Sequence, residues 1–370
     1  MTSRIDAVMD AAIANQKIVG AEVIVTHHGD VAYHRSAGWF DREADRPMID
    51  NAIYRLASLT KPIVAATALA MVDKGMVGLD DRVSRHIPWF APRLKDDREA
   101  EITIHHLLTH TAGLAYSYPQ DPTISTGLGA TDQGLEENFT RVARHPLEYE
   151  PGTAWQYSVA IDVLGAVLAQ VHGGTLDDAV KAHITGPLGM AETGFFVADE
   201  ERLAKPYADG MPPTPMSDPE NVQGDKGPLV FSPSRIFSKS AFQSGGAGMA
   251  GTPADMLRFF EALRNGGGGA VRQETVARAF SNQVGNVERD AGQRFGYLGA
   301  IVDDPLAANS PSAKGTVNWG GVYGHSWLID PVNGLCILSM SNTAVEGCTG
   351  RYPKDIIAAV YADLIRGEIK

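Results

Sequence analysis

The chain has 370 residues, of which 44% are hydrophobic and 21% charged, the balance of an ordinary globular protein. This length favours two lobes, or one α/β body with a large insertion. The 44 acidic and 32 basic side chains leave a net charge of −12, and no Lys/Arg cluster forms a basic face. Nucleic acid is therefore a poor partner. The longest apolar runs, such as residues 63–72, are too short to span a membrane, so no membrane partner is expected.

Cys336 and Cys348 are the only cysteines, too few for a disulfide framework, and no second Cys/His pair stands at structural-zinc spacing. We expect both to be reduced thiols, and we expect the protein to need no metal and no cofactor. Residues 1–9 place apolar positions at helical spacing and lack the continuous apolar core of a secretion signal. These features predict a first helix and a cytoplasmic location.

Strand-type residues stand near the N-terminus and helical patterns fill the middle of the chain. Residues 21–27 and 31–35 predict a hairpin around the turn at residues 28–30. A nearly continuous apolar run predicts a buried helix from Ser58 to Lys74. Further helices are predicted at 104–110, 161–172, 176–184 and 253–263.

The stretch from Lys205 to Pro233 holds seven prolines and little periodicity, which predicts a long surface loop over a cleft. Strand signals return at residues 317–319, 323–329 and 335–340, and a helix is predicted at 354–365.

Because strands from the two ends of the chain would pair, we expect an α+β protein. Residues 1–57 and 285–370 would form an α/β domain, an antiparallel sheet flanked by helices. Residues 58–284 would form an inserted, mainly helical domain with long loops. The active site would lie at the seam between them.

Ser58 and Lys61 form a Ser-x-x-Lys pair at the start of the predicted buried helix. Positions i and i+3 share a helix face, and the serine oxygen would lie at the positive helix end. This is the arrangement of an activated nucleophile. A capping serine and a solvated lysine would give the same spacing, so the rest of the chain has to decide.

Tyr157 stands just before the predicted helix at 161–172. A buried tyrosine in contact with Lys61 would share a proton with it, because both groups titrate at about 10 in water. A core tyrosine with a satisfied hydroxyl is the commoner alternative.

The segment from Trp319 to His325 carries three glycines on or beside a predicted strand. Glycines on a strand that faces a cleft let the backbone approach a substrate and direct an N–H at a developing oxyanion. The alternative interpretation is a β-bulge.

Six segments match the motifs of a known enzyme family in the same order along the chain, and the combination is specific. These segments are residues 54–61, 79–81, 102–114, 157–158, 187–190 and 324–327. The chain resembles the serine β-lactamase and penicillin-binding-protein superfamily, most closely the class C β-lactamase-like esterases known as family VIII carboxylesterases. The resemblance implies a β-lactamase/transpeptidase-like fold and Ser58 as the acylated nucleophile. It also implies a base role shared by Lys61 and Tyr157, and an oxyanion hole made by the amides of Ser58 and Val322.

Two departures from the β-lactamase pattern concern the substrate. Val159 replaces the asparagine expected two residues after the motif tyrosine, and Trp319-Gly320-Gly321 replaces Lys-Thr-Gly. A site without these polar partners favours small, apolar, uncharged acyl groups. The third motif has an alternative alignment, onto residues 325–327. The predicted substrate contacts, with core packing as the alternative for the aromatic ones, are Trp155, Val159, Trp319, Gly320, Gly321, Tyr323 and His325.

Three other patterns fit less well. Residues 324–328 nearly match the nucleophile elbow around Ser326, but the required strand-to-helix turn is absent. Residues 246–251 match Gly-x-Gly-x-x-Gly, but no buried parallel strand precedes them. His106 and His110 share a predicted helical face, but Leu107 stands where a zinc protease has glutamate. Neither a dinucleotide site nor a metal site is predicted.

The sequence therefore predicts a cofactor-independent serine esterase for small-molecule carboxylic esters. Within the enzyme class the alternatives are a β-lactamase, a D-amino-acid peptidase or amidase, and an acyltransferase that passes the acyl group to an alcohol. A non-catalytic acyl-binding protein that retains only the fold is the alternative from another class. The presence of all three reactive side chains argues against it.

Overall fold

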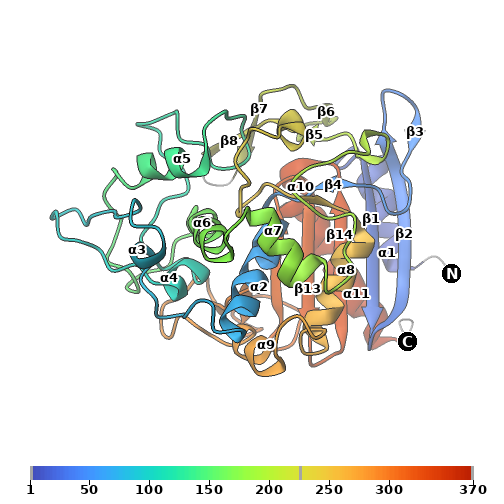
Figure 1. The fold of residues 1–370 in the computed structure, drawn as a ribbon. Coiled ribbons are helices and arrows are strands. Elements are labelled where there is room, and N and C mark those ends of the chain that lie inside the picture. The colour runs from blue at the N-terminus through green and yellow to red at the C-terminus, as the bar shows by residue number, and fades with distance from the viewer. Residues whose placement is uncertain (1–2, 225–226, 368–370) are drawn as a thin grey trace.

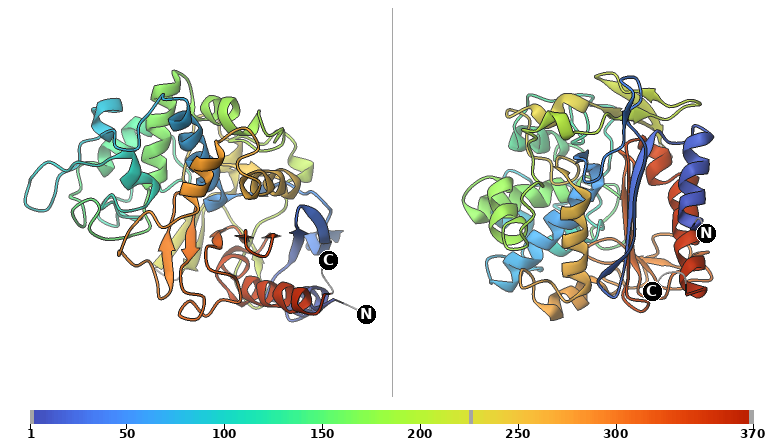
Figure 2. Two further views of the ribbon diagram at one scale, coloured as in Figure 1. Left: turned by 90° about the horizontal axis from the view of Figure 1, so that it is seen from below. Right: turned by 90° about the vertical axis from the view of Figure 1, so that its right-hand side faces the viewer.

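The structure is a computed structural model that describes residues 3–224 and 227–367. Met1 and Thr2, which belong to the predicted first helix, lie outside the described residues. One large sheet runs through the molecule, with α1 and α11 on one face and the other large helices on the opposite side (Figures 1 and 2).

The secondary structure follows the predicted order, with strands at both ends and helices between them. The helices are α1 (Arg4–Ala14), α2 (Thr60–Asp73), α3 (Val83–His86), α4 (Ile104–Leu108), α5 (Leu135–Val142), α6 (Ala160–His172), α7 (Leu176–Val180), α8 (Pro253–Arg264), α9 (Gln273–Ala279), α10 (Ala344–Cys348) and α11 (Arg351–Ile365). The strands are β1 (Gly20–His27), β2 (Asp30–Asp41), β3 (Arg46–Pro47), β4 (Tyr54–Arg55), β5 (Tyr207–Ala208), β6 (Thr214–Pro215), β7 (Glu220–Gly224), β8 (Gly227–Phe231), β9 (Ala250–Gly251), β10 (Gln293–Phe295), β11 (Ala300–Val302), β12 (Val317–Gly321), β13 (His325–Asp330) and β14 (Leu335–Ser341). Shorter helical turns are η1 (Ala57–Leu59), η2 (Lys181–Thr185), η3 (Glu200–Arg202) and η4 (Pro233–Phe237).

The main sheet has eight strands in the order β10-β11-β12-β13-β14-β1-β2-β3, and every neighbouring pair is antiparallel. β1 pairs with β14, so that Ala21 lies opposite Ser341 and His27 opposite Leu335. The predicted antiparallel sheet made from both ends of the chain is confirmed. The division of the chain at residues 57 and 284 stays a prediction.

Side chains along the central strands point alternately to the two faces of the sheet, and an apolar core lies on each face. Val23 and Val25 of β1 turn toward one face, where they pack with residues of α1 and α11 such as Met9 and Ile356. Trp327 of β13 turns to the other face, where its ring stacks on Phe260 of α8 with centroids 4.6 Å apart. The central strands β1, β13 and β14 are therefore buried on both sides.

The segment from Lys205 to Pro233 is not the structureless loop that its prolines predict. It holds two short hairpins, β5–β6 and β7–β8. Pro215 and Pro228 lie on these strands, which is possible because each strand of a two-stranded ribbon has an edge that needs no N–H donor.

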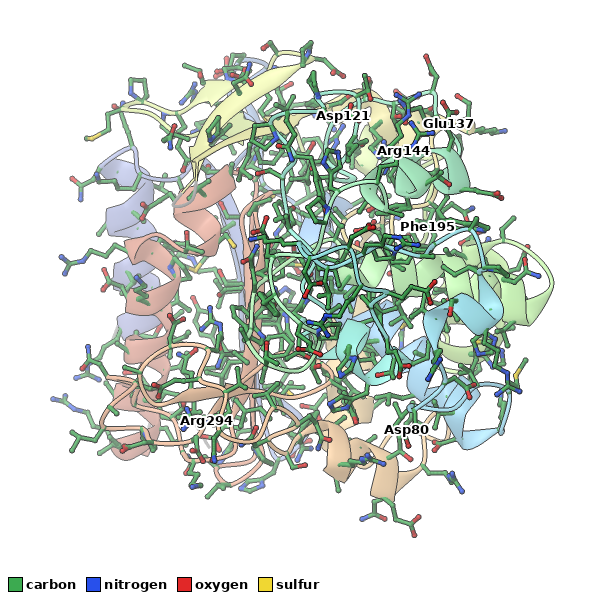
Figure 3. All side chains as sticks on the ribbon, turned by 90° about the vertical axis from the view of Figure 1, so that its left-hand side faces the viewer. Asp80, Asp121, Glu137, Arg144, Phe195 and Arg294 are labelled. Atoms are coloured by element: carbon green, nitrogen blue, oxygen red, sulfur yellow. The ribbon has the colours of Figure 1, made fainter. Side chains whose placement is uncertain are left out.

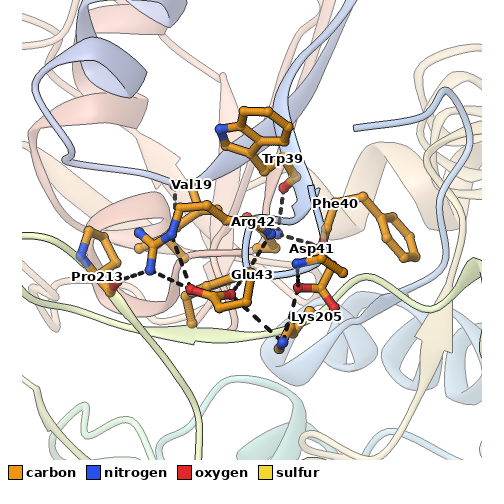
Figure 4. A network of polar contacts seen from close by, with 12 residues as sticks. Val19, Trp39, Phe40, Asp41, Arg42, Glu43, Lys205 and Pro213 are labelled. Atoms are coloured by element: carbon orange, nitrogen blue, oxygen red, sulfur yellow. Dashed lines mark hydrogen bonds and ion pairs between the residues drawn. The ribbon is translucent and has the colours of Figure 1, made fainter. Parts of the chain in front are cut away.

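Polar contacts anchor the start of this segment to the end of β2 (Figure 4). Lys205 Nζ lies 3.0 Å from Asp41 Oδ1, and Arg42 Nη2 donates to the Pro213 carbonyl at 2.9 Å. The segment is thus tied to the main sheet.

Two predicted helix boundaries are also wrong in detail. The helix predicted from Ser58 begins at Thr60, because Ser58 lies in the preceding turn η1. The helix predicted to reach His110 ends at Leu108, and His110 has a φ of 56°. His106 and His110 therefore do not share a helical face.

The outer surface of the helical side is polar. Asp80, Glu137 and Arg144 are exposed there, as Figure 3 shows. Within the described ranges, no helix is long and apolar enough to cross a bilayer. No disulfide joins Cys336 to Cys348.

Phe260→Ala should lower the free energy of unfolding by about 3–5 kcal/mol, because Phe260 is 1% exposed and its removal leaves a cavity against Trp327. Phe196→Ala is the matched control, since Phe196 is 44% exposed and its loss should cost well under about 1 kcal/mol. Urea denaturation of the two variants measures both values. Equal losses would contradict the proposed packing of α8 on the sheet.

Candidate active site

Ser58 lies in the turn η1, between the edge of the short sheet β4–β9 and helix α2. Its side chain is almost buried, with an exposed fraction of 4%. Ala57, immediately before it, has a φ of 44°, a left-handed conformation that costs energy for a residue with a Cβ. Such strain is typical of functional sites, where the surrounding structure fixes one side chain in an exact direction.

Ser58, Lys61 and Tyr157, predicted from three points of the sequence, meet at the serine oxygen. Ser58 Oγ lies 2.7 Å from Tyr157 Oη, and Lys61 Nζ donates to Ser58 Oγ at 3.3 Å. Lys61 Nζ also donates to the Gly246 carbonyl at 2.7 Å. The serine hydroxyl is therefore in contact with two groups that can take or give a proton.

Burial acts on the two partners of Ser58 in opposite directions. It lowers the pKa of Lys61, although Tyr116 and Asp162 nearby partly oppose the shift. It raises the pKa of Tyr157, although the hydrogen bond with Ser58 partly opposes this. Both effects favour the uncharged forms. A neutral lysine can accept a proton and a protonated tyrosine can donate one.

Two further rings pack against Tyr157, and sequence reasoning missed their place in the site. The ring of Tyr116 stacks on Tyr157 with centroids 5.2 Å apart, and the ring of His110 lies 4.9 Å from it. Burial and the nearby Lys61 lower the pKa of His110 far below its usual value, which keeps it neutral. His110 lies within the family segment 102–114 and Tyr116 lies just after it. This closeness to a family segment is the one sequence feature that could have pointed to them.

The end of β12 packs directly on the turn that carries Ser58. A Cβ at Gly321 would overlap the Leu56 carbonyl and lie 3.3 Å from the Leu59 nitrogen. A Cβ at Gly320 would lie 2.8 Å from Cys348 Sγ. These glycines are therefore explained by close packing between elements. Val322 is the next residue along the chain.

Trp319 and Trp155 belong to an aromatic cluster beside the triad. The Trp319 ring lies 5.3 Å from Tyr157 and 5.4 Å from Phe295, and Trp155 lies 5.3 Å from Phe295. The guanidinium of Arg289, which the sequence analysis did not single out, lies 5.0 Å from the Trp319 ring and 5.5 Å from the Trp155 ring. A small cavity beside Lys61 is lined mainly by apolar groups, among them Leu108, Phe295, Leu298 and Trp319.

Three side chains predicted to contact substrate are buried, and their contact with substrate stays a prediction. Val159 and His325 are both 0% exposed, and Tyr323 is 6% exposed with its ring against Phe231. His325 Nε2 lies 2.8 Å from the Arg55 carbonyl, and burial lowers the pKa of His325 to about 4. The neutral ring therefore donates to that carbonyl and braces the strand before η1. Proximity in sequence to a motif did not predict the direction of these side chains.

Ser326, the rival nucleophile, lies within strand β13 and is 8% exposed. It does not stand on the strand-to-helix turn that a nucleophile elbow requires. Among the residues that the structure describes, no three His, Cys, Asp or Glu side chains are grouped to hold a metal ion.

The family model described as "Beta-lactamase" matches residues 5–361. The chain belongs to the β-lactamase family. The chain is 46% identical to "Esterase EstB" of Burkholderia gladioli over 376 residues, 98% of this chain and 95% of that protein. It is 28% identical to "Lovastatin esterase" of Penicillium rubens, over 90% of each.

A solved structure, "EstCE1, a hydrolase with promiscuous acyltransferase activity", has a TM-score of 0.93 and 39% identity over 97% of both chains. The predicted β-lactamase/transpeptidase-like fold and membership of the superfamily are confirmed, and the protein is a serine hydrolase of this fold.

Gly321→Ala should separate β12 from η1 and lower both activity and stability, because its Cβ would overlap the backbone of Leu56. Gly134→Ala is the matched control: Gly134 has a φ of −69° and no atom within 4 Å of an added Cβ. We expect a loss of about 1–3 kcal/mol together with lost activity for Gly321→Ala. Gly134→Ala, at the N-cap of α5, should cost no more than about 1 kcal/mol and leave activity unchanged. Thermal unfolding and ester hydrolysis measure both; a fully active Gly321→Ala variant would contradict the packing argument.

Proposed function

We propose that this protein hydrolyses small, uncharged carboxylic esters through an acyl-enzyme on Ser58. The observation that carries the proposal is the contact of Ser58 Oγ with both Tyr157 Oη and Lys61 Nζ. The esterases among its relatives support it. No step requires a metal or a cofactor.

In the acylation step, Ser58 Oγ attacks the ester carbonyl while Lys61, in its neutral form, takes the hydroxyl proton. The amides of Ser58 and Val322 would stabilise the negative oxygen of the tetrahedral intermediate. When the C–O bond to the alcohol breaks, Tyr157 would give its proton to the leaving oxygen and recover one from Lys61. The products of this step are the free alcohol and the acylated serine.

In the deacylation step, a water molecule attacks the acyl carbonyl and gives a proton to the same pair of groups. The bond to Ser58 Oγ then breaks, and the serine recovers its proton. One ester and one water thus become one acid and one alcohol, and the three side chains return to their starting protonation states.

The surroundings of the triad favour esters over β-lactams. The triad is surrounded by the aromatic rings of Trp319, Tyr157 and Tyr116. Val159 stands where β-lactamases have an asparagine amide, and Trp319 stands where they have the lysine cation. A carboxylate on the substrate, such as that of a β-lactam, would therefore lose hydration without gaining the lysine as a charge partner. We also propose a cytoplasmic location, since Cys336 and Cys348 are not joined in a disulfide.

Ser58→Ala should abolish hydrolysis of p-nitrophenyl acetate and butyrate, because the variant lacks the nucleophile. The wild type should gain the mass of one acyl group in intact-protein mass spectrometry, and a chromogenic cephalosporin should be cleaved slowly if at all. Ser326→Ala is the matched control and should keep its activity. Hydrolysis that survives Ser58→Ala and is lost in Ser326→Ala would overturn the proposal.

Acyl transfer is the second candidate, favoured by the description of the structure with 39% identity as a hydrolase with acyltransferase activity. Adding a small primary alcohol during turnover separates the two: a hydrolase keeps releasing acid, whereas a transferase gives mainly the new ester. We expect acid as the main product. An acyl-enzyme that persists until the alcohol is added would assign the protein to acyl transfer instead.

The rate of hydrolysis should rise with pH, because only neutral Lys61 accepts the serine proton. Burial lowers the pKa of Lys61, so the midpoint of this rise should lie below 10.5, the ordinary value for lysine. Profiles of kcat/KM between about pH 5 and pH 10 measure it. Lys61→Arg should lose on the order of 10²–10⁴ of the rate, because arginine does not deprotonate in this range. A flat profile would exclude Lys61 as the base.

A further inference from the structure

We propose that Asp162 is a positioning residue that fixes the amine of Lys61 through the peptide of Gly246. This rests on the proposed role of Lys61 as the base that deprotonates Ser58. Asp162 lies in the first turn of α6, is 2% exposed, and makes neither a hydrogen bond nor an ion pair with Lys61 itself.

A continuous line of hydrogen bonds joins the two side chains. Asp162 Oδ1 accepts from Ser244 Oγ at 2.5 Å and from the Gly246 N–H at 3.1 Å. The carbonyl of Gly246 in turn accepts from Lys61 Nζ at 2.7 Å. Ser244 Oγ also accepts from the Ala247 N–H at 3.0 Å, so the carboxylate holds a closed turn. The position of the Gly246 carbonyl is thereby set from α6.

Two glycines allow this turn to lie directly on α6. A Cβ at Gly245 would lie 2.5 Å from the Ile161 carbonyl, and a Cβ at Gly246 would overlap Asp162 Oδ2. The Gly-x-Gly pattern that begins at Gly246 is thus accounted for without a nucleotide: the glycine brings the turn close enough for its N–H to reach the carboxylate.

Among the described residues that face these two side chains, Asp162 is the one carboxylate. Those around Lys61 are His110 and Tyr116 from the 109–118 region, Tyr157 before α6, and Asp162 on α6. Those around Asp162 are Lys61, Tyr116, Tyr157 and Arg235, the last from η4. A change of charge at Asp162 therefore acts on Lys61. Arg235 is the other cation among the groups named here.

A purely structural role for Asp162 makes different predictions from a positioning role. A carboxylate in the first turn of a helix stabilises the helix whatever lies beyond it. Such a role would lower stability on substitution and leave the catalytic pH dependence where it was. A carboxylate that holds the amine in place, and acts on its charge, affects kcat and the pH profile.

The test compares three variants on a p-nitrophenyl ester. Asp162→Asn keeps the shape and removes the charge; we expect kcat to fall on the order of tenfold or more with KM within about twofold. The rise of kcat/KM should move to lower pH, because neutral Lys61 is favoured once the nearby negative charge is gone. Ser244→Ala removes the hydrogen bonds of Ser244 Oγ to Asp162 and from the Ala247 N–H and keeps the charge, so kcat should fall while the midpoint of the rise stays in place.

The matched control is Asp255→Asn. Asp255 is 3% exposed in the first turn of α8, and its Oδ2 accepts from the Glu192 N–H at 2.8 Å and Thr193 Oγ1 at 3.1 Å. Its substitution should lower stability but change neither kcat nor the pH midpoint. If Asp162→Asn behaves like this control, the positioning role is wrong.

Intact-protein mass after mixing with ester separates failure of this inference from failure of the proposed function. If Ser58 becomes acylated but Asp162→Asn leaves kcat and the pH midpoint unchanged, the inference is overturned and the proposed function stands. Activity in Ser58→Ala overturns the proposed function and the inference with it. If Asp162→Asn does not fold, Ser244→Ala decides: reduced kcat with an unchanged KM supports the inference, and unchanged kcat overturns it.

Discussion

The burial of Lys61 is the constraint on which the rest of the site depends. Its side chain is 6% exposed, and the loss of water lowers its pKa. A direct ion pair would compensate the charge but would also keep the lysine protonated, and a protonated lysine takes no proton from Ser58. The Gly246 carbonyl, at 2.7 Å, holds the amine in either charge state. In the proposed mechanism, a carboxylate placed one peptide away, as Asp162 is, would position the amine and leave it basic.

The large sheet brings the parts of this site together. Ser58 lies after β4, Tyr157 before α6 and Val322 after β12, and no two of them are neighbours in sequence. Pairing of β14 with β1 joins the two ends of the chain, and Gly321 lets the end of β12 rest on η1. His325 adds a bond from β13 to the Arg55 carbonyl, just before the nucleophile turn. The position of Ser58 is thus fixed by contacts with β12 and β13, elements from the other end of the chain.

The sequence predicted the features that depend on local pattern or on a specific motif. The antiparallel sheet, the buried helix after Ser58 and the meeting of Ser58, Lys61 and Tyr157 belong to this class. Tyr116, Asp162 and Arg289 were missed because their roles come from tertiary contacts that leave no spacing to detect. The burial of Val159 and His325 was not predicted, because which way a side chain points depends on pairing and packing partners far away in the sequence. Their contact with substrate stays a prediction. The hairpins between residues 205 and 233 were hidden by prolines that isolated two-stranded ribbons tolerate.

The aromatic surroundings of the triad also bear on selectivity. Apolar walls such as Trp319 gain binding energy from contact area, and one methylene in such a site is worth only about 1–3 kcal/mol. A site of this kind separates small esters weakly from one another, whereas one built on hydrogen bonds to a particular group separates them strongly. The same weakness applies to the attacking group, because nothing described around Ser58 distinguishes water from a small alcohol except size and concentration. One kind of site could therefore serve both hydrolysis and acyl transfer. This agrees with relatives described as esterases and as a hydrolase with acyltransferase activity.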